Sequence, residues 1–274
     1  DNKKYIESLL ILQQILANNK NSILARIMTA QCLYQLDSSK EAIKAFNIVL
    51  TNDPYHVNSR YYLGKCYINS KQYNKAINEF TQVLLLYPDY ENTYYYLGLA
   101  YSNTNNNIRA LDALKRAIKI DPENGNAYFL IGKIYEDILE IEKSTNNYLL
   151  AKKFSLNNDM INYSLGMLYY RSDKLKLAME PLREFVILNP DSLNVLIALG
   201  EIFLGEERYQ EAIDTYLRLI KIYPSEINYY EQSFTLNLEK SSFQIEPTYL
   251  EQGLSPKLYI GNISDFDEEN LIKW

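Results

Sequence analysis

The residue types that most often carry catalysis or bind metals are scarce in this sequence. His56 is the only histidine, and Cys32 and Cys66 are the only cysteines. A zinc site usually takes four ligands from histidine, cysteine and carboxylate side chains, so this set is too small. A Ser-His-Asp or Cys-His arrangement would have to use His56, and no catalytic motif surrounds it. We therefore predict no metal site and no catalytic residues.

The remaining signals of enzyme chemistry are also missing. The sequence contains no phosphate-binding loop and no dinucleotide-binding fingerprint. The acidic pairs Glu206-Glu207 and Glu268-Glu269 read as solvated turns rather than as general acid/base pairs. We therefore expect no enzyme and no cofactor within these residues, although a catalytic domain could lie beyond them.

The two cysteines stand 34 residues apart, at equivalent positions of a repeat with that period. Equivalent points on neighbouring repeats lie about 10 Å apart when helices pack at the usual distance. A disulfide requires Cα atoms within about 7 Å of each other. Cys32 and Cys66 are therefore predicted to be free, small and buried.

Charge and hydropathy restrict the class of partner. The net charge is −6, and residues 227–274 hold eight acidic and three basic residues, so the rest of the chain is almost neutral. Nucleic-acid binding needs a basic stripe to neutralise phosphates, and none is present. No run of about 18 apolar residues exists, so no membrane insertion is expected. Nothing in the sequence indicates a cellular compartment.

Glycine, alanine and proline recur with a period of 34 residues. The clearest copy runs from Val57 to Tyr90 and contains two helical patterns, a polar turn between them and a closing proline. The recurring residues are the glycines Gly64, Gly98, Gly132, Gly166 and Gly200, the alanines Ala42, Ala76, Ala110, Ala178 and Ala212, and the prolines Pro54, Pro88, Pro122, Pro190 and Pro224. A period held by three residue types predicts a stack of helix–turn–helix units.

The same copy resembles the tetratricopeptide repeat, or TPR. Its pattern is carried here by Leu63-Gly64, Tyr67, Ala76, Phe80 and Pro88. The resemblance implies an all-α fold, a right-handed α-solenoid of stacked antiparallel helix pairs. It also implies a non-catalytic scaffold for protein–protein interaction.

The register divides the chain into segments. Residues 1–22 are expected to be the second helix of a partial preceding repeat. The six predicted repeats are 23–56, 57–90, 91–124, 125–158, 159–192 and 193–226. Residues 227–240 should form a capping helix, because a solenoid must cover its last apolar face. Residues 241–274 are expected to be an irregular acidic tail with one candidate strand at 257–260; it could be disordered, dock on the solenoid or begin another domain.

Two features within the repeats predict local packing. Gly64 and Gly98 lie inside helices, where glycine costs about 1 kcal/mol relative to alanine, so a close helix crossing is expected there. The fourth repeat is irregular, because residues 137–141 lack turn formers and Ser144 replaces the usual alanine. For this repeat we predict a longer first helix or an altered crossing angle.

The resemblance also implies a binding groove lined by the first helix of each pair. Counting from the start of each repeat, positions two, five, nine, twelve and thirteen should point into it. The predicted groove residues are Asn58, Tyr61, Lys65, Asn92, Tyr95, Leu99, Asn126, Phe129, Lys133, Tyr163, Met167 and Arg171. The aromatic residues at position five would form a ladder, and the asparagines offer a donor and an acceptor to an extended peptide.

Structural explanations for the same residues stay open. Aromatic residues at position five can simply pack between repeats, and the asparagines near helix starts can serve as N-caps. Tyr62 and Tyr96, next along the helix, are expected to be half-buried stacking residues.

The groove composition also narrows the partner. TPR proteins that clamp the acidic C-terminal tail of chaperones carry a set of Lys, Asn and Arg residues where this chain has mostly Tyr, Phe, Leu and Met. A protein or peptide with apolar or aromatic anchors fits better, with Lys65, Lys133 and Arg171 pairing occasional acids. Two alternatives remain: the tail fills the groove, giving autoinhibition or self-association, or the solenoid recruits substrates for a larger enzyme or assembly.

Overall fold

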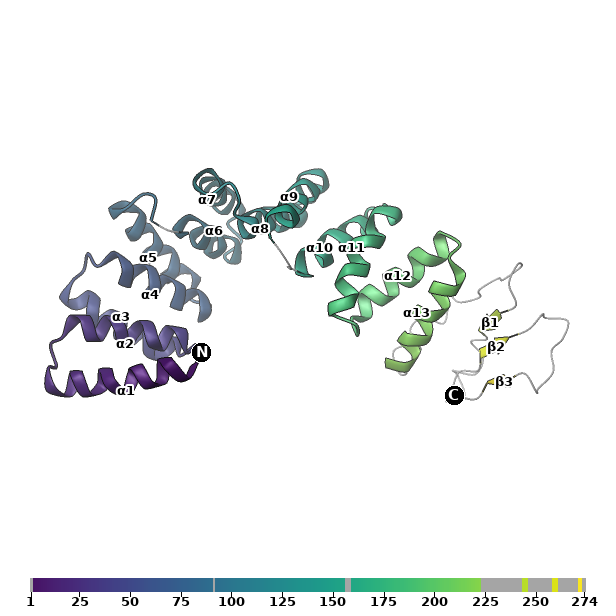
Figure 1. Cartoon of the computed structure of the whole chain (residues 1–274). Coiled ribbons are helices and arrows are strands. Elements are labelled where there is room, and N and C mark those ends of the chain that lie inside the picture. Colours follow the sequence, from purple (N-terminus) through teal and green to yellow (C-terminus); the bar gives the residue numbers. More distant parts are fainter. Residues whose placement is uncertain are drawn as a thin grey trace. The chain divides into compact units, whose positions relative to one another are not determined.

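The chain forms a succession of α-helices joined by short turns (Figure 1). A computed structural model describes residues 2–90, 92–155 and 159–222, and three short strands within 243–272. The helices are α1 (Asn2–Asn18), α2 (Ile23–Gln35), α3 (Ser39–Asn52), α4 (Val57–Asn69), α5 (Tyr73–Leu86), α6 (Thr93–Asn103), α7 (Asn107–Ile120), α8 (Gly125–Asp137), α9 (Ile141–Phe154), α10 (Asp159–Arg171), α11 (Leu175–Leu188), α12 (Leu193–Gly205) and α13 (Tyr209–Ile222). The predicted all-α solenoid of helix pairs is confirmed.

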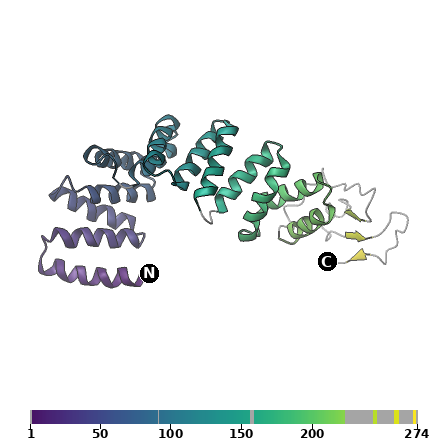
Figure 2. The ribbon, with the colours of Figure 1, turned by 45° about the horizontal axis from the view of Figure 1, so that its top comes forward.

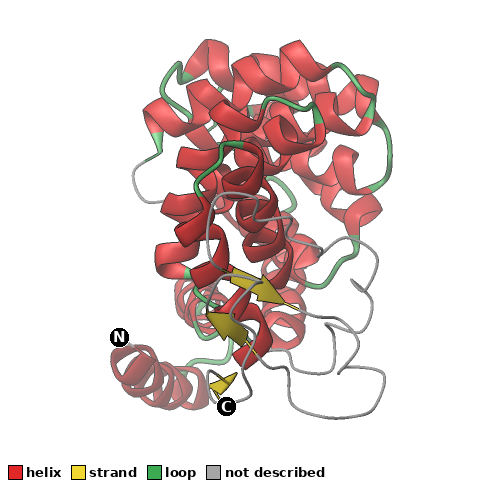
Figure 3. Cartoon of the chain, turned by 90° about the vertical axis from the view of Figure 1, so that its right-hand side faces the viewer, coloured by secondary structure: helices red, strands yellow, loops and turns green. Residues whose placement is uncertain are grey.

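The chain divides into two compact units, residues 1–168 and 169–274. In the first unit, helices that follow one another in sequence pack side by side, as α1 to α5 do in Figures 1 and 2. In the second unit, α12 packs against both α11 and α13. Coloured by secondary structure, the described part is helical apart from the turns and the three strands (Figure 3).

Side chains just before three of the first helices cap them. The side chains of Ser22, His56 and Asn124 accept hydrogen bonds from the backbone N–H groups of the residues three positions later. His56 does so through Nδ1, which lies 3.2 Å from the Ser59 nitrogen. They occupy the same place before α2, α4 and α8, whereas Ser192 at the equivalent place before α12 makes no such bond. The only histidine therefore has a structural role, which no sequence motif around it indicates.

Each turn within a repeat closes in the same way. A backbone N–H bonds back to the carbonyl five residues earlier in all six repeats, at 2.8–2.9 Å, as in a Schellman motif. The residue before that N–H has a positive φ of 56–62° in each case, and none of the six is a glycine. They are Asp37, Lys71, Asn105, Leu139, Asp173 and Glu207.

The fourth repeat follows this rule despite its sequence. Helix α8 ends at Asp137 after thirteen residues, as long as α4, so the predicted longer first helix is wrong. Leu139 takes up the turn with a φ of 62°. Packing enforces the turn, because Ser144 and Tyr148 of α9 are fully buried against α8. The Ser144 hydroxyl donates to the Gly132 carbonyl oxygen at 2.9 Å, which explains how serine is accommodated at a buried alanine position.

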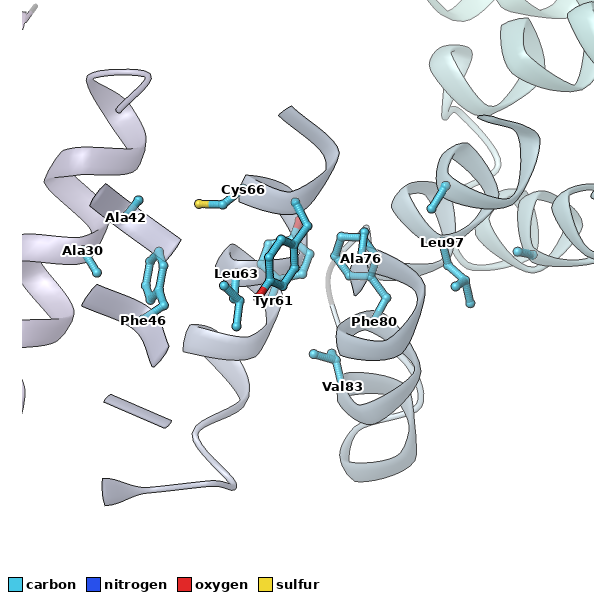
Figure 4. Close-up of a cluster of buried hydrophobic side chains, with 13 residues drawn as sticks. Ala30, Ala42, Phe46, Tyr61, Leu63, Cys66, Ala76, Phe80, Val83 and Leu97 are labelled. Carbon is cyan, nitrogen blue, oxygen red and sulfur yellow. The ribbon is translucent and has the colours of Figure 1, made fainter. Parts of the chain in front are cut away.

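The recurring glycines mark where the two helices of a pair come closest. A Cβ atom built on Gly64 would lie 2.6 Å from the Phe80 ring, and one on Gly98 would lie 2.6 Å from Leu114. The predicted close crossing is confirmed, but the group facing the glycine is the large side chain of the second helix. Ala76 is buried one turn earlier on the same helix as Phe80, and both appear in the core cluster of Figure 4.

Aromatic stacking joins the first three repeats to one another. The Phe46 ring stacks on Tyr62 with a centroid distance of 6.1 Å, and Phe80 stacks on Tyr96 at 5.8 Å. Phe80, which fills the space over Gly64, therefore also contacts the next repeat. The prediction that Tyr62 and Tyr96 are half-buried stacking residues is confirmed.

The two cysteines are free thiols, as predicted. Cys66 is fully buried, and burial raises the pKa of its thiol to about 12. Cys32 is only half-buried, so the prediction that it is buried is wrong. Burial nevertheless raises the pKa of the Cys32 thiol as well.

The C-terminal segment contains a small antiparallel sheet with strand order β1-β2-β3. Its strands are β1 (Phe243–Ile245), β2 (Leu258–Ile260) and β3 (Leu271–Ile272). The candidate strand at 257–260 is confirmed as β2, which pairs with both of the others. The predicted capping helix at 227–240 lies outside the described residues, and the assignment of residues 1–22 to a preceding repeat stays a prediction.

Replacing Gly64 with alanine should lower the midpoint of thermal unfolding. The added methyl group would force the Phe80 ring to move, and overpacking costs about 1–3 kcal/mol. This cost should exceed the gain of about 1 kcal/mol from removing a glycine inside a helix. In the control Gly205→Ala, the new Cβ would meet Leu175 at an ordinary 3.5 Å, so no loss is expected. Equal effects at the two sites would contradict this account.

Replacing Leu139 with asparagine should raise the unfolding midpoint. The left-handed conformation costs an L-residue about 1–2 kcal/mol, and asparagine tolerates it better than leucine. The Leu139 side chain is 81% exposed, so little packing is lost. The reverse change at the equivalent turn, Asn105→Leu, should lower the midpoint by a similar amount. A fall with Leu139→Asn would show that the leucine side chain itself stabilises the turn.

Candidate partner-binding surface

The predicted site residues recur at the same places on successive first helices. On α4 they are Asn58, Tyr61 and Lys65, whose spacing of three and four residues places them on one side of the helix. We call this surface the first-helix face, formed in the first unit by Asn58, Tyr61, Lys65, Asn92, Tyr95, Leu99, Asn126, Phe129, Lys133, Tyr163 and Met167. Arg171 ends α10 within the second unit, so it is left out of this surface.

The four aromatic residues at position five differ in exposure. Tyr61 is only 3% exposed and packs against the rings of Tyr62, Phe80, Tyr90 and Tyr96 with centroid distances of 5.4–6.2 Å. For Tyr61, packing between repeats is therefore the better explanation. Figure 4 shows it inside the core cluster.

The other three position-five rings are half-buried. Tyr95 contacts Tyr96 at 5.2 Å, and Phe129 contacts the buried Tyr148 at 5.6 Å. Burial raises the pKa of the Tyr95 hydroxyl, which therefore stays protonated at neutral pH. Tyr95, Phe129 and Tyr163 each keep part of their surface in solvent while the rest is fixed by the core.

The asparagines at position two are not N-caps that bond through their side chains. His56 caps α4, and Asn124 caps α8. Asn92 lies at the start of α6 but makes no side-chain cap bond. Asn126 is exposed, as is Asn92, whereas Asn58 is half-buried. The Oδ1 atom of Asn58 is enclosed and has no hydrogen-bond partner among the described residues.

Position nine alternates between cations and apolar side chains. Lys133 is exposed, whereas Lys65, Leu99 and Met167 are half-buried. The two lysines therefore differ in their surroundings even though they occupy equivalent positions two repeats apart.

Lys65 lies among tyrosine rings from three consecutive first helices. Its Nζ atom is 5.0–5.3 Å from the ring centroids of Tyr34, Tyr61, Tyr62 and Tyr96. Burial opposes the charged form, but the interactions with Tyr34 and Tyr96 outweigh it, so the pKa of Lys65 is raised. The repeat spacing predicts Lys65 on this surface but does not reveal the rings around it.

Two sequence profiles identify the family to which the chain belongs. Sequence profiles of the tetratricopeptide repeat match residues 57–90, 92–124 and 157–227, which together make up just over half of the chain. The chain belongs to the tetratricopeptide repeat family. TPR proteins are generally non-catalytic scaffolds that bind protein or peptide partners, so the match supports a protein-interaction scaffold. No protein with a curated description has a matching sequence.

Solved TPR structures share the fold at low sequence identity. The Pseudomonas aeruginosa protein PilF matches with a TM-score of 0.65 and 15% identity over 77% of this chain and 96% of its own. YrrB, described as a TPR protein with an unusual peptide-binding site, matches with a TM-score of 0.54 and 20% identity over 68% and 96%. A chain of the APC/C hetero-tetramer Cut9–Hcn1 matches with a TM-score of 0.62 and 16% identity over 81% of this chain, which spans only 44% of its length.

The predicted lack of a metal site and of a membrane-spanning helix can be compared with the described residues of this TPR protein. Within them, no group of three or more His, Cys, Asp or Glu side chains could hold a metal ion. The helices that the structure describes are all too short or too polar to cross a membrane. Glu207 lies in the turn between α12 and α13, as predicted, and Glu206 pairs with Lys176 at 3.8 Å. The pair Glu268-Glu269 is outside the described residues.

Proposed function

We propose that this TPR protein is a non-catalytic scaffold that binds an extended or helical protein segment across its first-helix face. The observation that supports this most is the repetition of a half-buried ring at position five on three successive helices, α6, α8 and α10. On α6 and α8 an exposed asparagine stands three residues before the ring. Rings held in this way offer apolar contact area without having to be ordered on binding.

The chemistry of the surface favours a polypeptide ligand. Exposed amide groups such as those of Asn92 and Asn126 can both donate to and accept from a peptide backbone. Between them, the exposed parts of Tyr95 and Phe129 can contact apolar anchors of the partner. Because the core fixes these rings, the partner loses most of the conformational entropy when the complex forms. YrrB, whose fold is similar, is described as having a peptide-binding site, which agrees with this role.

The proposal also favours a protein partner over nucleic acid and a scaffold over an enzyme. The nearly neutral charge of residues 1–226 supports a protein partner over nucleic acid. The lack of a catalytic motif supports a scaffold over an enzyme.

A second candidate function rests on the acidic balance of residues 227–274. In it, the tail competes with partners for the same face, either within one chain or between two copies. Removing residues 241–274 should then increase partner affinity and leave the helical circular-dichroism spectrum unchanged. Unchanged affinity would reject the competition.

The principal test changes exposed residues of the first-helix face. Peptides would be selected on the full chain from a randomised display library. Their affinities for the wild type and for the double variant Asn126→Ala, Lys133→Ala would then be compared. We expect binding to weaken about tenfold, equivalent to about 1.4 kcal/mol. Both side chains are exposed, so the midpoint of thermal unfolding should stay unchanged. Tyr95 and Phe129 are not changed in this test, because they also contribute to packing.

The matched control is Lys115→Ala, which removes an exposed lysine from the second helix α7. It should leave peptide affinity unchanged. The proposed function is wrong if the library yields no binding peptide, or if the double variant binds as tightly as the control.

A further inference from the structure

Lys65 is a half-buried cation without a carboxylate partner among the described residues. Arg60, on the same helix, shows the usual alternative: its guanidinium lies 2.7 Å from a carboxylate oxygen of Glu79. Around Lys65, the described groups that interact with the charge are tyrosines. Burying a charge is costly unless the charge is paired and hydrogen-bonded, so an anion bound beside Lys65 would lower this cost.

The rings around Lys65 stabilise its charge but do not neutralise it. Cation–π attraction arises from the ring quadrupole, and a tyrosine ring has no net charge. The four rings at 5.0–5.3 Å therefore leave one full positive charge on the first-helix face. Lys65 is also protonated at neutral pH, because its pKa lies above the ordinary value for lysine.

The hydrogen-bonding groups of this cluster favour an acceptor. An ammonium group has three N–H donors and no acceptor, and a tyrosine hydroxyl carries one O–H donor. Tyr34 and Tyr96 thus place two O–H donors near a single positive charge that has three N–H donors.

A carboxylate matches this set in both charge and hydrogen bonding. It carries one negative charge, and its two oxygens only accept hydrogen bonds. A phosphate group, which carries more negative charge at pH 7, would leave an excess that no second cation of the cluster offsets. Tyr95 contacts Tyr96 beside this cluster, so an apolar residue next to the carboxylate would have a ring to pack against.

We propose that Lys65, with the hydroxyl groups of Tyr34 and Tyr96, binds one carboxylate of the partner segment. This subsite uses first helices of the first three repeats, α2, α4 and α6. It differs from a clamp of several basic and amide side chains, because a single cation is held by tyrosines. The inference rests on the proposed function, since it names the chemistry that the first-helix face selects in a partner.

The test selects peptides on three forms of the full chain: wild type, Lys65→Met and Lys115→Met. Lys115 is exposed on the second helix α7, outside the first-helix face, so it is the matched control. The library would contain randomised twelve-residue peptides with amidated C-termini. Wild type and Lys115→Met should enrich Asp or Glu at one fixed position, and Lys65→Met should lose this enrichment.

A selected peptide then separates the contributions and the source of the carboxylate. Changing its enriched Glu to Gln should weaken binding to wild type about tenfold and change binding to Lys65→Met little. The double variant Tyr34→Phe, Tyr96→Phe keeps the rings, removes the hydroxyl groups and should reduce the Glu preference several-fold. It also provides the test if Lys65→Met fails to fold. A parallel library lacking acidic residues, with free C-termini, shows whether a terminal carboxylate can replace the side chain.

The outcomes distinguish the two proposals. Peptides that bind without any carboxylate preference, or with the same preference on Lys65→Met, would overturn the Lys65 subsite and leave the proposed function standing. Recovery of no peptide from either library would overturn both. Preference in the free C-terminus library alone would retain the subsite and assign it to a terminal carboxylate.

Discussion

The contact between a small residue on one helix and a large side chain on the next controls the rest of this structure. At Gly64 the space that a methyl group would take is filled by the ring of Phe80, and the same arrangement recurs with Leu114 and Tyr148. The large side chain also reaches the following repeat, as the stacking of Phe80 on Tyr96 shows. One contact type therefore fixes both the pairing within a repeat and the spacing between repeats.

This packing decides which side chains remain for binding. Where three repeats meet around α4, tyrosines fill the junction. Tyr61 is buried in the core there, and Lys65 lies at the edge of the core. At α8, Tyr128 stacks on Phe154 at 5.7 Å, the buried core is otherwise mostly aliphatic, and Tyr148 donates to Glu136 at 2.6 Å. Burial and the acceptor carboxylate raise the pKa of Tyr148, so this hydroxyl stays a donor. The two ends of the first-helix face thus differ in chemistry despite one repeat pattern.

The sequence was enough to predict the helix pairs, the close crossings and the free thiols, because each depends on residue type at a fixed period. It could not predict that Leu139 would occupy a left-handed turn, since this conformation is imposed by buried neighbours rather than by local preference. It also could not rank the position-five rings by exposure, because that depends on residues such as Tyr90 that lie outside the repeat pattern. The rings around Lys65 come from three repeats, so no single repeat contained the signal.

The stacked pairs Phe46–Tyr62 and Phe80–Tyr96 join residues only sixteen positions apart in the chain. Such short loops lose little entropy on closure, and contacts between near neighbours favour rapid folding. A linear array can begin to fold at any repeat and spread from it. We therefore expect α3 to α6 to act as the nucleus, with amide hydrogens there becoming protected earlier during refolding than those of the later helices.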